Sequence, residues 1–155
     1  MTFEIFHDLD GVHADFHAHF FHISGISISE VPKKDLWKII GKNKTFFYDL
    51  PIFPGSQELW EFCTTSFKKN RVLTGAPSST VSRLQKRHWV AKYFGSHIHV
   101  DVVARRDKQT FAHAKGILID DTEANIVEWI AAGGIGIHHI GSDFQRTINK
   151  LKKYL

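Results

Sequence analysis

Two aspartates one residue apart, Asp8 and Asp10, follow the short apolar stretch of residues 3–6 and precede Gly11. Alternate side chains of an extended segment share a face, so both carboxylates can point into one site. Two like charges that close need a divalent cation or a shared proton to offset their repulsion. Asp and Gly are also common in surface turns, so this pair taken alone favours a turn over a site. The rest of the chain reverses that preference.

Three further polar features lie at the ends of later apolar stretches. They are Thr74 with Gly75, the basic cluster of residues 105–108 that ends in Lys108, and the pair Asp120 and Asp121. The carboxyl ends of parallel strands meet at one edge of an open sheet, so these groups converge with Asp8 and Asp10. The Thr74 hydroxyl and the nearby amides can hold a phosphate at the start of the next helix, or Thr74 can simply cap that helix.

Carboxylates at this edge define the chemistry that the crevice can support. Asp8, Asp10 and Asp121 offer oxygen ligands that suit a hard cation, most simply Mg²⁺. A cation together with Lys108 would neutralise a phosphoryl group during in-line attack. The spacing therefore predicts phosphoryl-transfer chemistry with bound magnesium.

The elements that must position these residues alternate along the chain. We expect strands at residues 3–7, 71–74, 98–103, 116–120 and 135–140, and helices at residues 56–69, 78–94, 122–132 and 142–155. In residues 78–94 the expected buried face contains Val81, Leu84, Tyr93 and, less well phased, Trp89. Ser142 is the expected N-cap of the last helix. This alternation predicts an α/β fold, a three-layer, Rossmann-like parallel sheet with helices on both faces.

Residues 13–53 interrupt the alternation and contain no convincing strand. Short helices are expected at about residues 15–24 and 32–40. An insertion after the first strand would lie over the carboxyl edge of the sheet, where a lid covers chemistry in other enzymes. We therefore expect one domain over residues 1–155 with a small helical cap at about residues 13–53.

Composition limits the classes of protein that the chain can belong to. A net charge of +4 is a mild bias that suits phosphate esters, but the charge alone does not argue for nucleic acid as a partner. The single cysteine, Cys63, excludes an internal disulfide and is expected to be a buried, unreactive thiol. No signal-peptide pattern and no apolar run of about 18 residues is present, so we expect a cytoplasmic protein without membrane contact.

The order of these motifs resembles that of the haloacid dehalogenase superfamily of phosphohydrolases. Residues 8–12 are similar to the first motif of that superfamily, residues 73–75 to the second, Lys108 to the third and residues 119–121 to the fourth. Within the superfamily, the chain looks most like the 5′(3′)-deoxyribonucleotidase (5′-nucleotidase type C) branch. The segments that carry this finer resemblance are residues 46–55, 86–95, 106–108 and 118–121.

The resemblance implies a role for each catalytic residue. Asp8 would be the nucleophile that forms an aspartyl-phosphate, and Asp10 the acid for the leaving alkoxide and then the base for water. Thr74 and Lys108 would hold phosphate oxygens. Mg²⁺ would be held by Asp8, the carbonyl of Asp10 and Asp121, with Asp120 ligating through water or orienting its neighbour.

The resemblance also implies a nucleoside monophosphate as substrate. Gly75 and Lys86 would contact it, and Phe46, Phe47 and Tyr48 would form either the small core of the cap or a platform for the base. The chain departs from the branch in its short cap, in Gly75 where a hydroxyl residue is often found, and in a longer spacing from Lys108 to the acidic pair. These departures concern the substrate more than the chemistry.

Several alternatives remain open from the sequence. The substrate could be another small phosphoester or a nucleic-acid end, or the chain could bind nucleotides without catalysis; nucleic acid is otherwise not expected as a partner, and a homodimer is compatible with the sequence. Lys115 is a rival for the lysine role, although it is expected at the wrong end of its strand. His13 and His17 have the spacing of helical zinc ligands, but without Cys or an HExxH motif we favour core or surface histidines.

Overall fold

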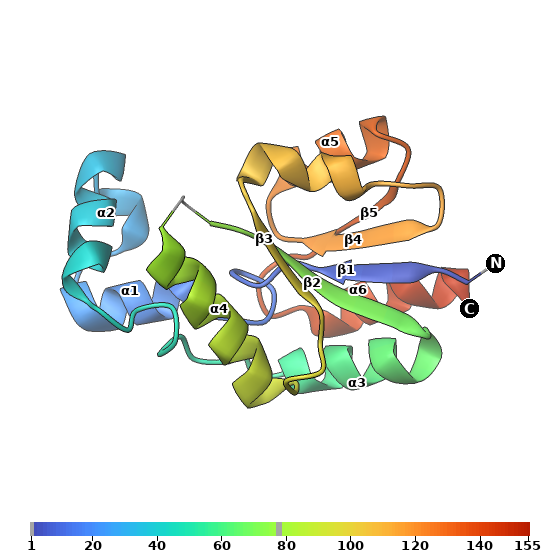
Figure 1. The fold of residues 1–155 in the computed structure, drawn as a ribbon, viewed down its shortest axis with the longest axis horizontal. Coiled ribbons are helices and arrows are strands. Elements are labelled where there is room, and N and C mark those ends of the chain that lie inside the picture. Colours follow the sequence, from blue (N-terminus) through green and yellow to red (C-terminus); the bar gives the residue numbers. More distant parts are fainter. Residues whose placement is uncertain (1, 77–78) are drawn as a thin grey trace.

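A five-stranded parallel sheet forms the centre of the computed structural model, which describes residues 2–76 and 79–155 (Figure 1). The strand order is β3-β2-β1-β4-β5. The strands are β1 (Glu4–His7), β2 (Lys69–Gly75), β3 (Val100–Val103), β4 (Gly116–Asp120) and β5 (Ile135–His138). All five residues of β4 are buried, as expected for a central strand covered on both faces. The strand order places β1 between β2 and β4, so Asp8 and Asp10, which follow β1, lie at the end of the central strand.

Helices cover both faces of this sheet and give the three layers that the sequence predicts. The helices after the cap are α3 (Ser56–Ser66), α4 (Thr80–Tyr93), α5 (Glu123–Ala131) and α6 (Phe144–Leu151), with 3₁₀ turns η2 (Arg105–Phe111) and η3 (Lys152–Tyr154). On one face, Ile5 and Ile119 pack in one cluster with Leu59 of α3 and Ile148 of α6. The other face buries apolar side chains of β1, β2 and β4 against α5 and η2. The α/β sheet with helices on both faces is therefore confirmed.

Two details of the helices differ from the sequence prediction. The buried face of α4 carries Ser82, Lys86, Trp89 and Val90. The prediction was right for Trp89 and wrong for Val81 and Leu84, which are exposed. The reason is that the buried ammonium of Lys86 finds acceptors inside the protein, which allows a charged residue to occupy a core position. Helix α6 is capped by the side chain of Asp143, which accepts from the Arg146 amide, and not by Ser142.

A small helical cap lies beyond the carboxyl ends of the strands (Figure 1). It consists of α1 (Phe16–Ser24), the turn η1 (Ile28–Glu30) and α2 (Lys33–Lys42), between β1 and α3. The two segments that join it to the sheet pair with each other, because the Asp15 amide donates to Pro51 (2.8 Å) and the Phe53 amide donates to His13 (2.9 Å). This pairing positions the cap over the edge where the predicted site residues leave the sheet.

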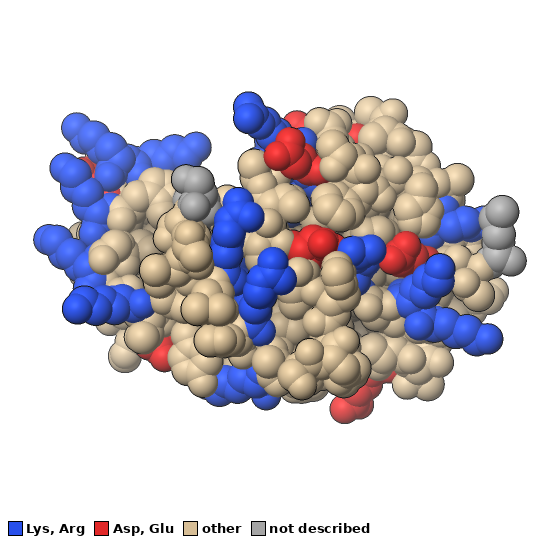
Figure 2. Space-filling model, viewed as in Figure 1, with Lys and Arg blue, Asp and Glu red and all other residues tan. Residues whose placement is uncertain are grey.

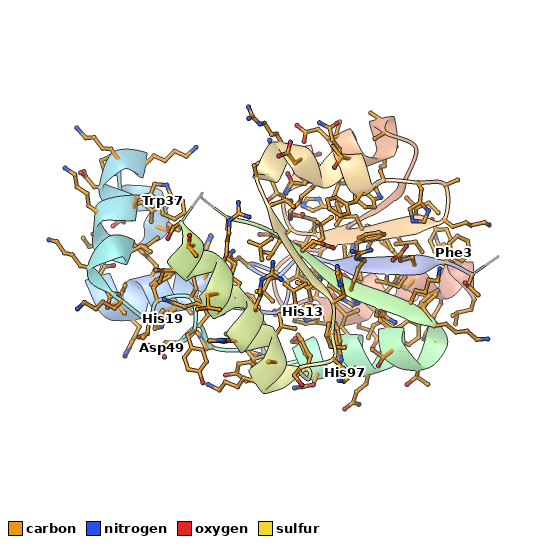
Figure 3. The ribbon with its side chains drawn as sticks, viewed as in Figure 1. Phe3, His13, His19, Trp37, Asp49 and His97 are labelled. Atoms are coloured by element: carbon orange, nitrogen blue, oxygen red, sulfur yellow. The ribbon has the colours of Figure 1, made fainter. Side chains whose placement is uncertain are left out.

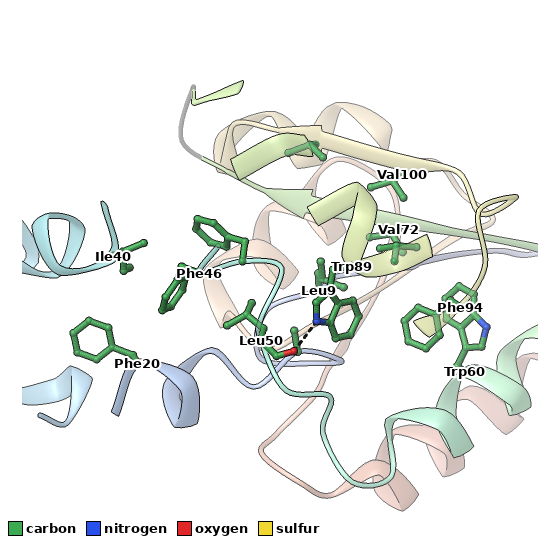
Figure 4. Close-up of a cluster of buried hydrophobic side chains, with 14 residues drawn as sticks. Leu9, Phe20, Ile40, Phe46, Leu50, Trp60, Val72, Trp89, Phe94 and Val100 are labelled. Atoms are coloured by element: carbon green, nitrogen blue, oxygen red, sulfur yellow. Dashed lines mark hydrogen bonds between the residues drawn. The ribbon is translucent and has the colours of Figure 1, made fainter. Parts of the chain in front are cut away.

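Cap and sheet share one apolar cluster (Figure 4). Phe20, Ile40 and Phe46 from the cap belong to the same cluster as Val72 of β2 and Trp89 of α4. The Trp89 indole donates to the carbonyl of Leu50 (2.7 Å), which satisfies the polar atom of a fully buried ring. The cap is thus packed against the rest of the molecule rather than joined to it by its linkers alone.

Cys63 lies in α3 with no exposed surface, and burial raises its pKa to about 12. The thiol is therefore protonated and unreactive near neutral pH, as the sequence predicts. Across residues 2–76 and 79–155 no helix has both the length and the apolar character needed to cross a bilayer.

Candidate active site

A buried lysine lies between two buried carboxylates at the carboxyl edge of the sheet. The Lys108 ammonium donates to Asp8 Oδ1 and to Asp120 Oδ2, both at 2.7 Å. Asp8 follows β1, Asp120 ends β4 and Lys108 comes from η2, so three distant segments meet here. Charges this deeply buried are stable only when paired, so removal of one partner leaves the others uncompensated.

Asp121 adds a third carboxylate to this group. Asp8, Asp120 and Asp121 each offer an oxygen, and these oxygens lie within 4.8 Å of one another. Gly11 makes the close packing possible: its φ is +84°, and a Cβ at that position would overlap the Asp121 carboxylate. A glycine at this turn is therefore required both by the backbone and by the neighbouring ligand group.

The charges of this group explain its pKa shifts and the ion it can hold. Burial raises the pKa of Asp8, the neighbouring Asp120 and Asp121 raise it further, and Lys108 opposes them. Burial and Asp120 likewise raise the pKa of Asp121. Burial works against a charged Lys108, but Asp8 and Asp120 raise its pKa. One lysine does not balance three carboxylates, and an all-oxygen donor set fits a hard divalent cation such as Mg²⁺.

Asp120 has few remaining lone pairs for a metal. Its Oδ1 accepts from the Thr122 amide (2.9 Å), and its Oδ2 accepts from the Asn125 amide group (3.0 Å) as well as from Lys108. The side chain is completely buried. Of the two roles left open by the sequence, ligation through water and orientation of a neighbour, these contacts fit the second, with Lys108 as the neighbour that is oriented.

Asp10 pairs with a different lysine, Lys86 of α4. The Lys86 ammonium donates to Asp10 Oδ2 (2.7 Å), to the carbonyl of Gly75 (2.8 Å) and to the hydroxyl of Thr74 (3.2 Å). These three acceptors use all its protons, so Lys86 holds Asp10 and Thr74 in place, whereas the sequence predicted a substrate contact. Among the described residues, no group bonds to the buried Asp10 Oδ1.

These groups line a hollow of about 270 Å³, here called the carboxylate hollow. Of the residues predicted from the sequence, the structure brings together Asp8, Asp10, Thr74, Gly75, Lys108 and Asp121. Phe16, His17 and Ile28 reach the hollow from the cap, and Arg105 reaches it from η2. Sequence reasoning missed Phe16 and Ile28; it named Arg105 only as part of the basic cluster and His17 only as a zinc-ligand alternative. For Phe16 and His17 a signal was present, because they open the first cap helix directly after Asp15, its N-cap.

A second hollow of about 460 Å³ continues from the first. The two share Gly11, Phe16, His17 and Asp121 in their linings, and the second extends to residues 138–141 after β5. A group attached to a phosphate in the carboxylate hollow would therefore have apolar space beside Phe16.

The aromatic segment predicted to contact the substrate lies elsewhere. Phe46 is buried and packs edge-on against Phe16, with ring centroids 5.2 Å apart. Phe47 is also buried and faces the Lys86 ammonium, and Tyr48 faces Lys92 on the outside of α4. None of the three lines the carboxylate hollow. A cap this short has few other residues with which to build a core, so Phe46 and Phe47 fit the core alternative.

Two buried histidines, His7 and His13, tie the cap linkers to the sheet, and Figure 3 labels His13 near the centre of the molecule. His13 contacts Ser56 Oγ through Nδ1 (2.6 Å) and His7 Nδ1 through Nε2 (3.0 Å), and His7 Nε2 contacts Asn70 Oδ1 (3.1 Å). Because the Asn70 oxygen only accepts, His7 must donate to it, so His13 donates to His7 and the Ser56 hydroxyl donates to His13. Burial lowers the pKa of His7 to about 4 and lowers that of His13 well below its usual value.

The structure also locates the residues that the sequence left as alternatives, the histidine pair and Lys115. His13 precedes α1 and points into the core, whereas His17 lines the hollow, so the two do not form a helical zinc pair. The Lys115 ammonium lies over the Phe3 ring, 4.4 Å from its centroid, beside the amino end of β4. It is thus at the opposite edge of the sheet from Lys108.

No protein-family model matches the sequence, and no curated protein matches it. Solved structures do match. A haloacid dehalogenase-like family hydrolase from Xanthomonas campestris superposes with a TM-score of 0.66 at 12% identity, covering 99% of this chain and 91% of that one. The fold is that of haloacid dehalogenase-like hydrolases.

Other solved structures with the haloacid dehalogenase-like fold match over similar lengths. A haloacid dehalogenase-superfamily hydrolase from Ehrlichia chaffeensis has a TM-score of 0.58 at 13% identity, with 99% of this chain and 98% of that chain covered. A hydrolase from Deinococcus radiodurans R1, solved with bound phosphate and sodium, has a TM-score of 0.55 at 11% identity and covers 97% and 88% of the two chains. Identities this low establish the shared fold and leave the activity of this chain to be argued from its own residues.

Proposed function

We propose that this protein is a Mg²⁺-dependent phosphomonoesterase that acts through an aspartyl-phosphate on Asp8. The observation that carries the proposal is the placement of Asp8: a buried carboxylate held by Lys108, within a hollow that also contains Thr74 and Asp121. The combination supplies an oriented nucleophile and positive charge at one point. The haloacid dehalogenase-like fold of the neighbours, one of them solved with phosphate, supports the same reaction class.

In the first step, an Asp8 carboxylate oxygen attacks phosphorus and the bond from phosphorus to the ester oxygen breaks. Lys108 donates to Asp8 Oδ1 and thereby sets which oxygen faces the substrate. Asp10 carries the proton for the departing alkoxide, and the contact of Lys86 with Oδ2 holds its carboxyl group in place. The Thr74 hydroxyl donates to a phosphoryl oxygen.

In the second step, the Asp10 carboxylate accepts a proton from water while that water attacks phosphorus. The bond from phosphorus to Asp8 breaks, which releases inorganic phosphate and restores both aspartates. Lys86 holds Asp10 in the same place through both steps, because its other two contacts are to β2. Asp8, Asp121 and the carbonyl of Asp10 would hold Mg²⁺, which supplies charge neutralisation for the phosphoryl oxygens when bound.

A nucleoside 5′-monophosphate is the substrate that we propose within this class. The Phe16 ring lines both the carboxylate hollow and the larger hollow beside it, which suits a flat leaving group next to the phosphate. The resemblance of several sequence segments to the deoxyribonucleotidases points to the same substrate.

The proposal is tested by assaying a panel of phosphomonoesters with Mg²⁺ and with excess chelator. We expect release of phosphate from at least one nucleoside monophosphate, only with the metal. Asp8→Asn preserves size and removes the nucleophile, so turnover should fall by about three orders of magnitude or more while the fold persists. Nucleotide binding without hydrolysis of any ester would instead favour a non-catalytic nucleotide-binding protein.

A further inference from the structure

One segment of the cap, α2 and the two residues after it, carries a net positive charge as large as that of the whole chain. Residues 33–44 contain five lysines and one aspartate, a net charge of +4, which equals the net charge of all 155 residues. The rest of the chain is therefore neutral overall. All five lysines are exposed, and none forms an ion pair within the described part of the chain; they are Lys33, Lys34, Lys38, Lys42 and Lys44, here called the cap lysines.

A half-exposed tryptophan lies among the cap lysines. Trp37 is 44% exposed on α2, whereas Ile40 is buried and Leu36 and Ile39 pack partly against the cap core. Figure 3 shows Trp37 in the cap, and its side chain lines a cavity of about 520 Å³ that α2 forms with the start of α4. Since the other apolar residues of α2 point inward, the helix lacks the wide apolar face needed to insert into a bilayer.

This basic surface belongs to the same cap that covers the carboxylate hollow. Figure 2 shows a notch between the cap and the lobe that carries α5, with basic side chains on both margins. Arg105 of η2 also lines the hollow; its side chain is 49% exposed and pairs at 3.2 Å with Glu128 of α5, which is 36% exposed. A polyanion that placed one phosphate in the hollow would find further positive charge at both margins.

We propose that the nucleoside monophosphate unit recognised by the carboxylate hollow is, in the physiological substrate, the terminal nucleotide of a single-stranded nucleic acid, whose strand is bound by the cap lysines and Trp37. This rests on the proposed function, because the terminal phosphate enters the carboxylate hollow. Lysines bind backbone phosphates without regard to sequence, and bases stack on exposed aromatic rings. Hydrolysis consumes one water, breaks the terminal ester bond, leaves a hydroxyl on the strand and releases inorganic phosphate.

The test compares thymidine 5′-monophosphate with an oligothymidylate of about ten nucleotides, a typical single-strand site size, phosphorylated at either its 5′ or its 3′ end. We expect kcat/KM at low salt to be at least about tenfold higher for one of the two oligonucleotides, which corresponds to one stacked base or more. Binding of a fluorescent strand without terminal phosphate is measured separately by anisotropy in chelator, so that it does not depend on catalysis.

Two variants with the same change in net charge distinguish strand binding by the cap lysines from a general effect of the protein's charge. The first neutralises three cap lysines, Lys34→Gln, Lys38→Gln and Lys42→Gln. The second neutralises Lys150→Gln, Lys152→Gln and Lys153→Gln, near the chain end opposite the cap in Figure 1. We expect the cap variant to lose the oligonucleotide preference and to lower the slope of log affinity against log salt by about 2, at about 0.7 per phosphate contact. The second variant should retain both.

The outcomes distinguish this inference from the proposed function. Equal kcat/KM for mononucleotide and oligonucleotide, or equal effects of the two variants, would refute the nucleic-acid surface and leave the phosphatase intact. Strand binding that depends on the cap lysines, without hydrolysis of any ester, would support the surface and refute the phosphatase. Binding to phosphatidylserine vesicles in place of the strand would overturn the inference in favour of a membrane surface.

Discussion

Replacing Lys108 by Met removes the only ammonium that contacts Asp8 and Asp120 in the described structure and keeps most of the side-chain volume. The lysine side chain is 5% exposed, and its partners are 8% and 0% exposed, so water cannot replace the lost charge. Breaking a buried ion pair by removing one partner costs about 3–5 kcal/mol. We expect a loss of this size in the free energy of unfolding, measured in excess chelator.

Magnesium should return a large part of the lost stability of Lys108→Met, because the three carboxylates then gain a divalent cation in place of the ammonium. Urea unfolding followed by tryptophan fluorescence measures both states. With a urea slope of about 2 kcal/mol per molar, the loss is a shift of roughly 2 M in the midpoint, and Mg²⁺ should shift it back further in the variant than in the wild type.

Lys115→Met is the matched control for Lys108→Met. Its ammonium lies over the Phe3 ring and contacts no carboxylate, so the loss should stay at about 1 kcal/mol or below, with or without Mg²⁺. An equal loss for Lys108→Met in chelator and in Mg²⁺ would refute the reasoning, because the lysine would then be compensating something other than the carboxylate cluster.

Three further changes follow from the same geometry. Gly11→Ala places a Cβ against the Asp121 carboxylate and should lower kcat/KM by about a hundredfold. Gly133→Ala is the control, because Gly133 also has a positive φ but has open space around it. It should lower the free energy of unfolding in urea by only about 1–2 kcal/mol and leave activity intact. Phe16→Ala should reduce kcat/KM for a nucleoside monophosphate by about tenfold or more while a small aliphatic phosphate ester loses less; equal losses would make the ring structural. Burial lowers the pKa of His13, so as the pH falls the unfolded chain binds a proton there before the folded chain does. The stability of the wild type should therefore fall as the pH drops below about 6.5. His13→Gln should flatten this decline in urea midpoints measured from pH 7 to pH 4, and an unchanged slope would count against a neutral buried imidazole.

Local sequence patterns were sufficient for the sheet and for much of the carboxylate hollow. Apolar runs ending in polar residues located all five strands, and in a parallel sheet the ends of such runs must meet at one edge. The prediction that Asp8, Thr74, Lys108 and Asp121 gather there needed only strand order along the chain. The 3.6-residue period likewise located the helices, since amphipathic patterns depend on neighbours a few residues apart.

The tertiary structure alone decided which way several side chains point. Lys86 is buried because Asp10, Thr74 and Gly75 are brought to it from segments up to 76 residues distant, and no local pattern contains that compensation. The same packing buries Phe46 in the cap core and leaves Phe16 to line the hollow. Sequence determines which residues carry charge or apolar surface; whether each faces a core, a partner or a ligand depends on contacts between segments that meet only in the folded chain.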